Sequence, residues 1–150
     1  MFPQTLQTSF FTGLSNIRCC DVAVKYENQR KTLILLVVGQ DNLKRNILAM
    51  YDITDFAYRE PSLFCKKISD FDIRSAKFLD KRDANQFVTC GKENIRFWRL
   101  KHKVINGVSL VLNEHGRDTV FNDFCVFDYD NLVNIQQMPQ DAENIKNNYK

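Results

Sequence analysis

Short apolar stretches separated by turn residues run along most of the chain. They are rich in β-branched and aromatic residues and too short for helices, which is typical of the strands of an antiparallel meander. Strands are predicted at Ala23–Tyr26, Leu33–Val38, Ile47–Ile53, Leu63–Lys67, Ile73–Phe78, Phe87–Cys90, Ile95–Leu100 and Val108–Leu112. The pattern predicts an all-β fold in which a group of four strands occurs twice.

Landmark residues recur along the chain at matching spacings. Tyr26, Phe78 and Phe127 each end a first-strand pattern, and they lie 52 and 49 residues apart. Gly39 follows 13 residues after Tyr26, and Gly91 follows 13 residues after Phe78. Stacked units that share one core place equivalent residues at equivalent offsets, so these spacings predict an array of repeats.

A polar turn follows each glycine and leads into a third strand that ends in an aromatic and a polar residue. These endings are Tyr51-Asp52 in the first repeat and Trp98-Arg99 in the second. The length of each repeat beyond its four strands lies in connections such as 54–62, where insertions are tolerated because the entropy cost of a loop grows slowly with its length. Each repeat is therefore expected to be one four-stranded unit.

The second repeat carries a resemblance to a known family. The stretch Gln86–Leu100 resembles the second and third strands of a WD-repeat blade. Together with Gly107–His115 and Val120–Phe127 it is similar to the centriolar WD-repeat family of the proteome-of-centriole type, which has tandem propellers. The echinoderm microtubule-associated-protein-like family resembles the first stretch well and the others less closely.

This resemblance implies a partial WD-repeat β-propeller of about two four-stranded blades plus flanking strands. We expect the end of a preceding blade and a loop in 1–18, with Thr8–Phe11 as its last strand. Blades are expected in 19–68 and 69–112, the start of a third in 113–127, and a polar tail without its own core in 128–150. Two blades cannot close a ring, so further blades or partner subunits are expected to cap them.

The repeats and the resemblance mark several residues as structural blade positions. They are Tyr26, Gly39, Tyr51, Phe78, Thr89, Gly91, Trp98 and Phe127. Thr89 is expected to hydrogen-bond to the indole of Trp98. The usual His–Ser/Thr–Trp–Asp network is incomplete, because the Trp-Asp signature is replaced in both repeats, so packing is expected to stabilise the blades.

The densest basic cluster follows Gly91. It consists of Lys92, Arg96, Arg99, Lys101, His102 and Lys103. One interpretation is a contact with an acidic surface such as tubulin, or with nucleic-acid phosphates. The other is a solvated blade edge, where lysines discourage aberrant strand pairing.

Composition narrows the class of protein. With 150 residues, 44% of them hydrophobic, the chain can bury a substantial core, and its formal net charge of +3 is too small to indicate nucleic-acid binding. Five cysteines without a C-x-x-C pair, and an N-terminus without a secretory pattern, favour a reducing cytosol. The longest apolar run, Leu33–Val38, is too short to span a bilayer.

No catalytic, cofactor or metal site is expected. His102 and His115 lie in predicted loops without a nucleophile motif, and the five glycines are too scattered for a phosphate loop. The adjacent Cys19 and Cys20 point to opposite faces of a strand and lack a second pair at ligand spacing. We expect a protein that is not an enzyme.

The resemblance implies a structural or scaffold protein of the cytoskeleton, in the axoneme of cilia or in basal bodies and centrioles. Its expected partners are tubulin in microtubules and other ciliary or centriolar proteins, with neither nucleic acid nor membrane. The alternative is a generic protein-interaction WD-repeat scaffold in a non-ciliary assembly.

Overall fold

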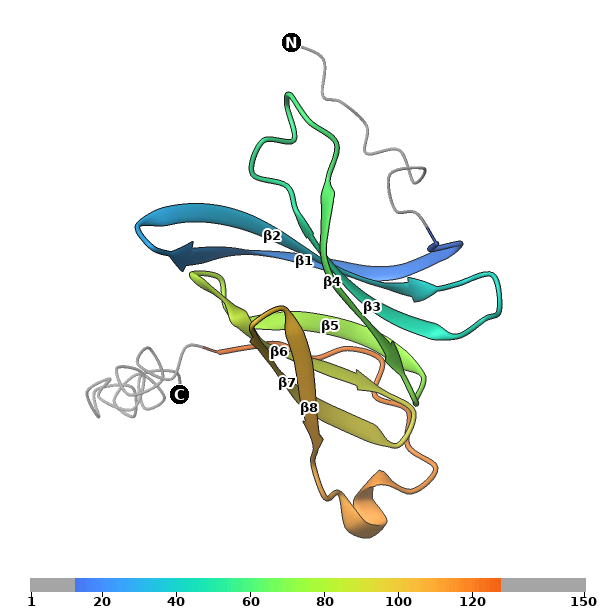
Figure 1. Cartoon of the computed structure of the whole chain (residues 1–150). Coiled ribbons are helices and arrows are strands. Elements are labelled where there is room, and N and C mark those ends of the chain that lie inside the picture. Colours follow the sequence, from blue (N-terminus) through green and yellow to red (C-terminus); the bar gives the residue numbers. More distant parts are fainter. Residues whose placement is uncertain (1–12, 128–150) are drawn as a thin grey trace, which may run out of the picture.

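A computed structural model describes residues 13–127 of the chain, and the expected strand Thr8–Phe11 and tail 128–150 lie outside them. Antiparallel strands form two four-stranded sheets, which face each other in Figure 1. Sheet A consists of β1 (Asn16–Glu27), β2 (Arg30–Gln40), β3 (Asn46–Asp52) and β4 (Ser62–Ser69). Sheet B consists of β5 (Ile73–Asp80), β6 (Asp83–Gly91), β7 (Asn94–Lys101) and β8 (Val104–Ser109). The predicted all-β fold is confirmed.

The last strand differs from its prediction at Val108–Leu112. A turn at His102 and Lys103 joins β7 directly to β8, which begins at Val104. That turn contains neither glycine nor asparagine, and β8 lies at a sheet edge where most side chains are exposed. Neither turn chemistry nor alternating hydrophobicity therefore marks the true start of this strand.

The two sheets share one internal register. Gly39 of β2 pairs with Ile17 of β1, and Gly91 of β6 pairs with Ile73 of β5. In both sheets the pairing of the first strand shifts directly after the isoleucine, as a β-bulge does. The glycines expected to be equivalent therefore occupy equivalent pairing positions.

Equivalent rows of the two sheets point in different directions relative to the interface. Leu35 pairs with Tyr51 in sheet A, and Phe87 pairs with Trp98 in sheet B, each row beginning four residues before its glycine. Phe87 and Trp98 belong to the core between the sheets, whereas Leu35 and Tyr51 belong to a separate cluster on the far face of sheet A. The interface therefore joins opposite faces of the two sheets, so that the front face of one sheet packs on the back face of the other.

The first strands of the sheets lie closest together. β1 contacts β5 and β6 along much of its length, while β4 and β8 approach each other more weakly. The shared core contains fully buried side chains from both sheets, including Leu36 and Met50 from sheet A and Phe78 and Phe87 from sheet B. After β8 the chain forms a 3-10 turn at Asn113–Gly116.

Candidate functional site

The aromatic centre of the interface is built on three neighbouring strands of sheet B. Phe78, Phe87 and Trp98 are cross-strand neighbours on β5, β6 and β7. Phe87 stacks on Trp98 with ring centroids 5.9 Å apart, and Phe78 meets Phe87 edge to face at 6.1 Å. The Trp98 indole donates a buried hydrogen bond of 2.8 Å to Thr89 Oγ1, as predicted.

One further residue makes room for this aromatic row. Gly107 of β8 pairs with Trp98, and a Cβ at Gly107 would lie 2.4 Å from Cε3 of the indole. The indole therefore occupies the space that a side chain would fill. Sequence reasoning assigned no role to Gly107, because it was expected to precede its strand.

The first-strand aromatic residues of the two sheets, Tyr26 and Phe78, are not equivalent, contrary to the expectation. In sheet B, Phe78 is buried and pairs with Phe87. In sheet A, the residue equivalent to Phe87 is Leu35, and its partner on the first strand is Val22. Tyr26 lies four positions further along β1, beside the β1–β2 turn, and is 62% exposed. The hairpin of β1 and β2 is longer than that of β5 and β6, so the offset from Tyr26 to Phe78 does not link equivalent residues.

The remaining aromatic position lies after the second sheet. Phe127 is 68% exposed and belongs to no strand. The segment before it runs along the far face of sheet B, where Ser75 Oγ donates a 2.6 Å hydrogen bond to Asp123. Lys77 lies 2.7 Å from the same carboxylate. Together with β5, β6 and β7 this segment lines an open apolar pocket of about 290 Å³.

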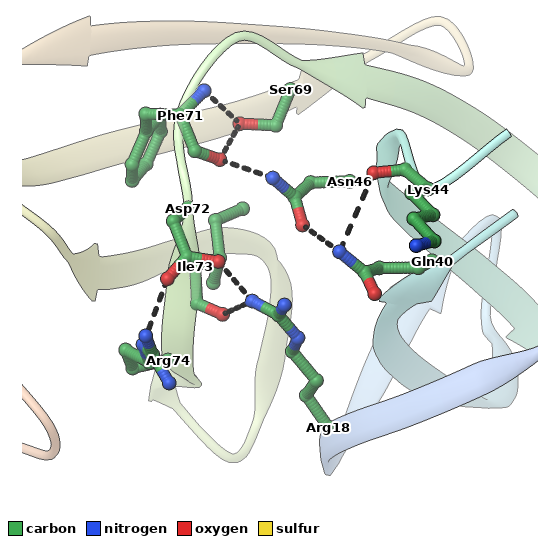
Figure 2. Close-up of polar contacts among 9 residues, drawn as sticks. All are labelled: Arg18, Gln40, Lys44, Asn46, Ser69, Phe71, Asp72, Ile73 and Arg74. Atoms are coloured by element: carbon green, nitrogen blue, oxygen red, sulfur yellow. Dashed lines mark hydrogen bonds and ion pairs between the residues drawn. The ribbon is translucent and has the colours of Figure 1, made fainter.

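A polar junction fixes the start of sheet B against sheet A (Figure 2). Arg18, at the bulge of β1, donates hydrogen bonds to the Asp72 carboxylate and to the backbone carbonyl of Ile73. Arg74, at the bulge of β5, forms a second ion pair of 2.8 Å with Asp72. One aspartate in the link between the sheets therefore connects the bulges of both.

Side-chain amides hold the same link from the other side. Asn46 Nδ2 donates a 3.0 Å hydrogen bond to the Phe71 carbonyl, and Gln40 Nε2 reaches Asn46 Oδ1 at 3.5 Å (Figure 2). Ser69 Oγ and the Phe71 backbone exchange hydrogen bonds across a tight turn. The β4–β5 link is thus held by Arg18 of β1 and Asn46 of β3, while Gln40 of β2 supports the Asn46 side chain.

The predicted basic cluster is divided between the two faces and the two ends of β7. Arg96 points into the interface, where its guanidinium lies 4.8 Å from the Phe71 ring and pairs with Asp70 at 2.7 Å. Arg99 and Lys101 alternate with Arg96 along the strand, and both are exposed. Since successive side chains of a strand point to opposite faces, the arginines do not form one surface.

The other basic residues occupy turns. Lys92 is exposed in the β6–β7 turn. His102 and Lys103 form the β7–β8 turn at the opposite end of the strand. There the Lys103 ammonium lies 5.4 Å from the centre of the Phe64 ring, and that of Lys25 lies 4.9 Å from the same ring. Sequence reasoning did not join Lys25 and Phe64 to this group.

Thiols in the described region are free, and several are buried. Burial raises the pKa of the Cys19 thiol to about 11, and burial does the same for Cys65. The pKa of Cys90 is also raised, chiefly by burial. These thiols are therefore protonated at neutral pH and act as small apolar side chains.

Within residues 13–127 there is no group of three or more histidine, cysteine, aspartate or glutamate side chains able to hold a metal ion. No helix in this part of the chain is long and apolar enough to cross a membrane.

No protein-family model, no curated protein and no solved structure matches the chain.

Proposed function

We propose that this chain is a stretch of WD-repeat β-propeller that acts as a structural scaffold and not as an enzyme. Its partners in this proposal are microtubule walls and neighbouring proteins of cilia or basal bodies. The proposed propeller supports a scaffold role, because propeller blades present loops and edges on which other proteins can dock.

The observation that carries the propeller interpretation is the stacking of the two sheets. Propeller blades are related by rotation, so each blade packs its front face on the back face of its neighbour. Phe87 and Trp98 face sheet A, while their equivalents Leu35 and Tyr51 face away from sheet B. A sandwich with two-fold symmetry would instead bring equivalent rows together.

The far face of sheet B supports the same interpretation. Val88 and Phe97, the equivalents of Leu36 and Met50 in the interface, line the cavity beside segment 120–127. Phe97 is 42% exposed. A third sheet that begins with this segment would cover these side chains as sheet B covers sheet A.

The ciliary assignment rests on the resemblance of Gln86–Leu100 and the segments after it to the centriolar WD-repeat family. Among the basic residues near β7, Arg99 and Lys101 are exposed and lie beyond Phe97 toward the β7–β8 turn, where they are available to an acidic surface such as tubulin. Arg96 is already engaged by Asp70 and is a poor candidate for that contact.

Microtubule co-sedimentation of the whole chain tests this proposal. The wild type should pellet with microtubules, and Arg99→Glu with Lys101→Glu should reduce pelleting severalfold at physiological salt. The matched control is Lys31→Glu with Lys67→Glu, which changes the same charge at exposed positions of sheet A. Failure of the wild type to pellet would remove the microtubule partner, and a pulldown of other assemblies would then favour the generic scaffold.

A further inference from the structure

Two lysines from different sheets converge on one aromatic ring at the end of the interface. Lys25 of β1 and Lys103 of the β7–β8 turn place their ammonium groups 4.9 Å and 5.4 Å from the centre of the Phe64 ring of β4. An ammonium over an aromatic face is attracted by the ring quadrupole. The ring thus holds two positive charges near each other although they repel.

A backbone irregularity of β4 places the Phe64 ring. Phe64 lies where the β3–β4 pairing shifts register, between Leu63 opposite Tyr51 and Cys65 opposite Met50. Such a bulge redirects a side chain and is common beside binding sites. The bulge therefore accounts for the Phe64 ring reaching the mouth of the interface.

The turn that carries Lys103 is in a costly conformation. His102 and Lys103 have φ angles of 48° and 62°, in the left-handed region that favours glycine or asparagine. This backbone conformation is strained for residues other than glycine and asparagine, and strain of this kind is concentrated at functional sites. A glycine at position 103 would relax the turn but would remove the ammonium from the ring.

A carboxylate of the protein already occupies part of this charged region. Glu27 pairs with Lys25 at 2.6 Å, and its side chain is 65% exposed. The hydrogen bond and charge of Lys25, followed by the charges of His102 and Lys103, lower the pKa of Glu27. One solvent-facing carboxylate is therefore surrounded by several cationic side chains.

Among the described residues, the second lysine of this group lacks the kind of ion pair that Lys25 forms with Glu27. In the described part of the chain, no carboxylate lies within ion-pair distance of Lys103. Next to it is an open cavity of about 360 Å³, whose lining includes Lys25, Arg30, Glu27, Asp52 and Phe64. A hollow of this size lies at the lower end of the usual range of ligand pockets.

We propose that Lys25, Lys103 and Phe64 form a binding site for an acidic peptide segment, whose carboxylates pair with Lys103 and displace Glu27 from Lys25. The ring and the lysine stems give an apolar wall for the methylene groups of a glutamate. This site needs only the two sheets and goes beyond the propeller proposal.

The chemistry favours a peptide over a nucleic acid. Glu27 and Asp52 line the hollow together with Lys25 and Arg30, so the charge beside the site is mixed and not uniformly positive. Glu27 also remains close to any bound group, and it would repel a backbone of closely spaced phosphates more than a flexible peptide.

Fluorescence anisotropy with a fluorescein-labelled oligoglutamate peptide and the whole chain tests the site. Lys103→Gln should weaken binding about threefold, and Lys25→Gln with Lys103→Gln about tenfold. The matched control is Lys92→Gln, which removes one exposed charge at the opposite end of β7. Because Lys25 is largely buried, Lys103→Glu at the exposed turn provides a second variant that leaves the core intact.

Glu27→Gln provides the sharpest test. Removing the competing carboxylate should tighten peptide binding about twofold to threefold, although a general loss of packing would weaken it. Unchanged or weaker binding by Glu27→Gln, equal loss in Lys92→Gln, or no binding by the wild type would overturn the proposal. Equal competition by a DNA oligonucleotide of the same net charge would also overturn it, in favour of a non-selective anion surface.

Discussion

Trp98 has a single polar group on a large apolar ring, and its burial makes a partner for that group necessary. Thr89 Oγ1 is this partner, at 2.8 Å and with no measurable exposure. The bond links β6 to β7 inside the interface. The roles of Thr89 and Trp98 could be predicted from the sequence, because both residues lie in the segment that resembles a WD-repeat blade.

Thr89→Val keeps the shape of the side chain and removes the acceptor. We expect the free energy of unfolding to fall by about 1–3 kcal/mol, because the indole N–H stays buried without a partner. Urea denaturation followed by Trp98 fluorescence measures the change. Thr32→Val, at a half-buried position of β2, is the control, and equal losses in the two variants would contradict the role of the hydrogen bond.

Gly107→Ala should destabilise the protein through the same indole. The new methyl group would lie 2.4 Å from a ring carbon of Trp98, so the ring or β8 must shift, at a cost of about 1–3 kcal/mol. A red shift of Trp98 fluorescence should accompany the lower stability. Asn106→Ala, next to it on β8 and exposed, should leave the emission spectrum unchanged.

Buried thiols make stability depend on alkaline pH. Burial raises the pKa of Cys19 and Cys65 from the ordinary 9.0 to about 11. Below pH 9 both thiols are neutral in the folded and unfolded states, whereas between pH 9 and 11 the unfolded state alone loses their protons. Stability should therefore fall across this window, and Cys65→Ala should reduce the slope of the free energy of unfolding against pH.

Thiol labelling at neutral pH gives an independent check. Cys20 and Cys125 are exposed and should react rapidly, the partly exposed Cys19 should react more slowly, and the buried Cys65 and Cys90 should react only after unfolding. Mass spectrometry of partially labelled protein distinguishes these sites. Rapid labelling of Cys65 in the folded chain would contradict the packing of β4 on the core.

At the scale of elements, most strands could be predicted because their apolar runs are bounded by turn residues. Leu33–Val38 lies within β2, and Ile95–Leu100 lies within β7. β8 could not be placed, since a glycine-free turn and an exposed edge remove both signals. The equivalence of Tyr26 and Phe78 failed for a related reason: hairpin length is set by pairing between strands and not by spacing along one strand.

The basic cluster shows how a cluster in sequence can be divided in space. Alternation along β7 sends Arg96 into the interface and Arg99 away from it. Conversely, Lys25, Phe64 and Lys103 come together only because the sheets stack. No spacing along the chain could have indicated that group.

The link between β4 and β5 should contribute to docking of the sheets. Asp72→Asn removes the charge that Arg18 and Arg74 share, and we expect a loss of about 0.5–1 kcal/mol because these groups are only partly exposed. Asp80→Asn is the control, since the ion pair of Asp80 with Arg82 stays within the β5–β6 hairpin. The effect of Asp72→Asn should shrink at high salt, and equal losses in the two variants would contradict a role in docking.

At the scale of the whole molecule, the stacking direction is the property with the widest consequences. Because unlike faces meet, further sheets of the same kind could continue the stack in the same sense. The repeat of the strands along the chain indicated equivalent units. Which of their faces would meet depends on close packing of the side chains, which spacing alone does not determine.

Nuclear Overhauser contacts in the isotopically labelled chain test this stacking most directly. We expect contacts from the ring protons of Phe78, Phe87 and Trp98 to side chains of sheet A that share one core with those rings, namely Ile34, Leu36, Val38 and Met50. Contacts from the same rings to Leu35 and Val37, on the other face of β2, would instead show that equivalent faces meet and would contradict the account.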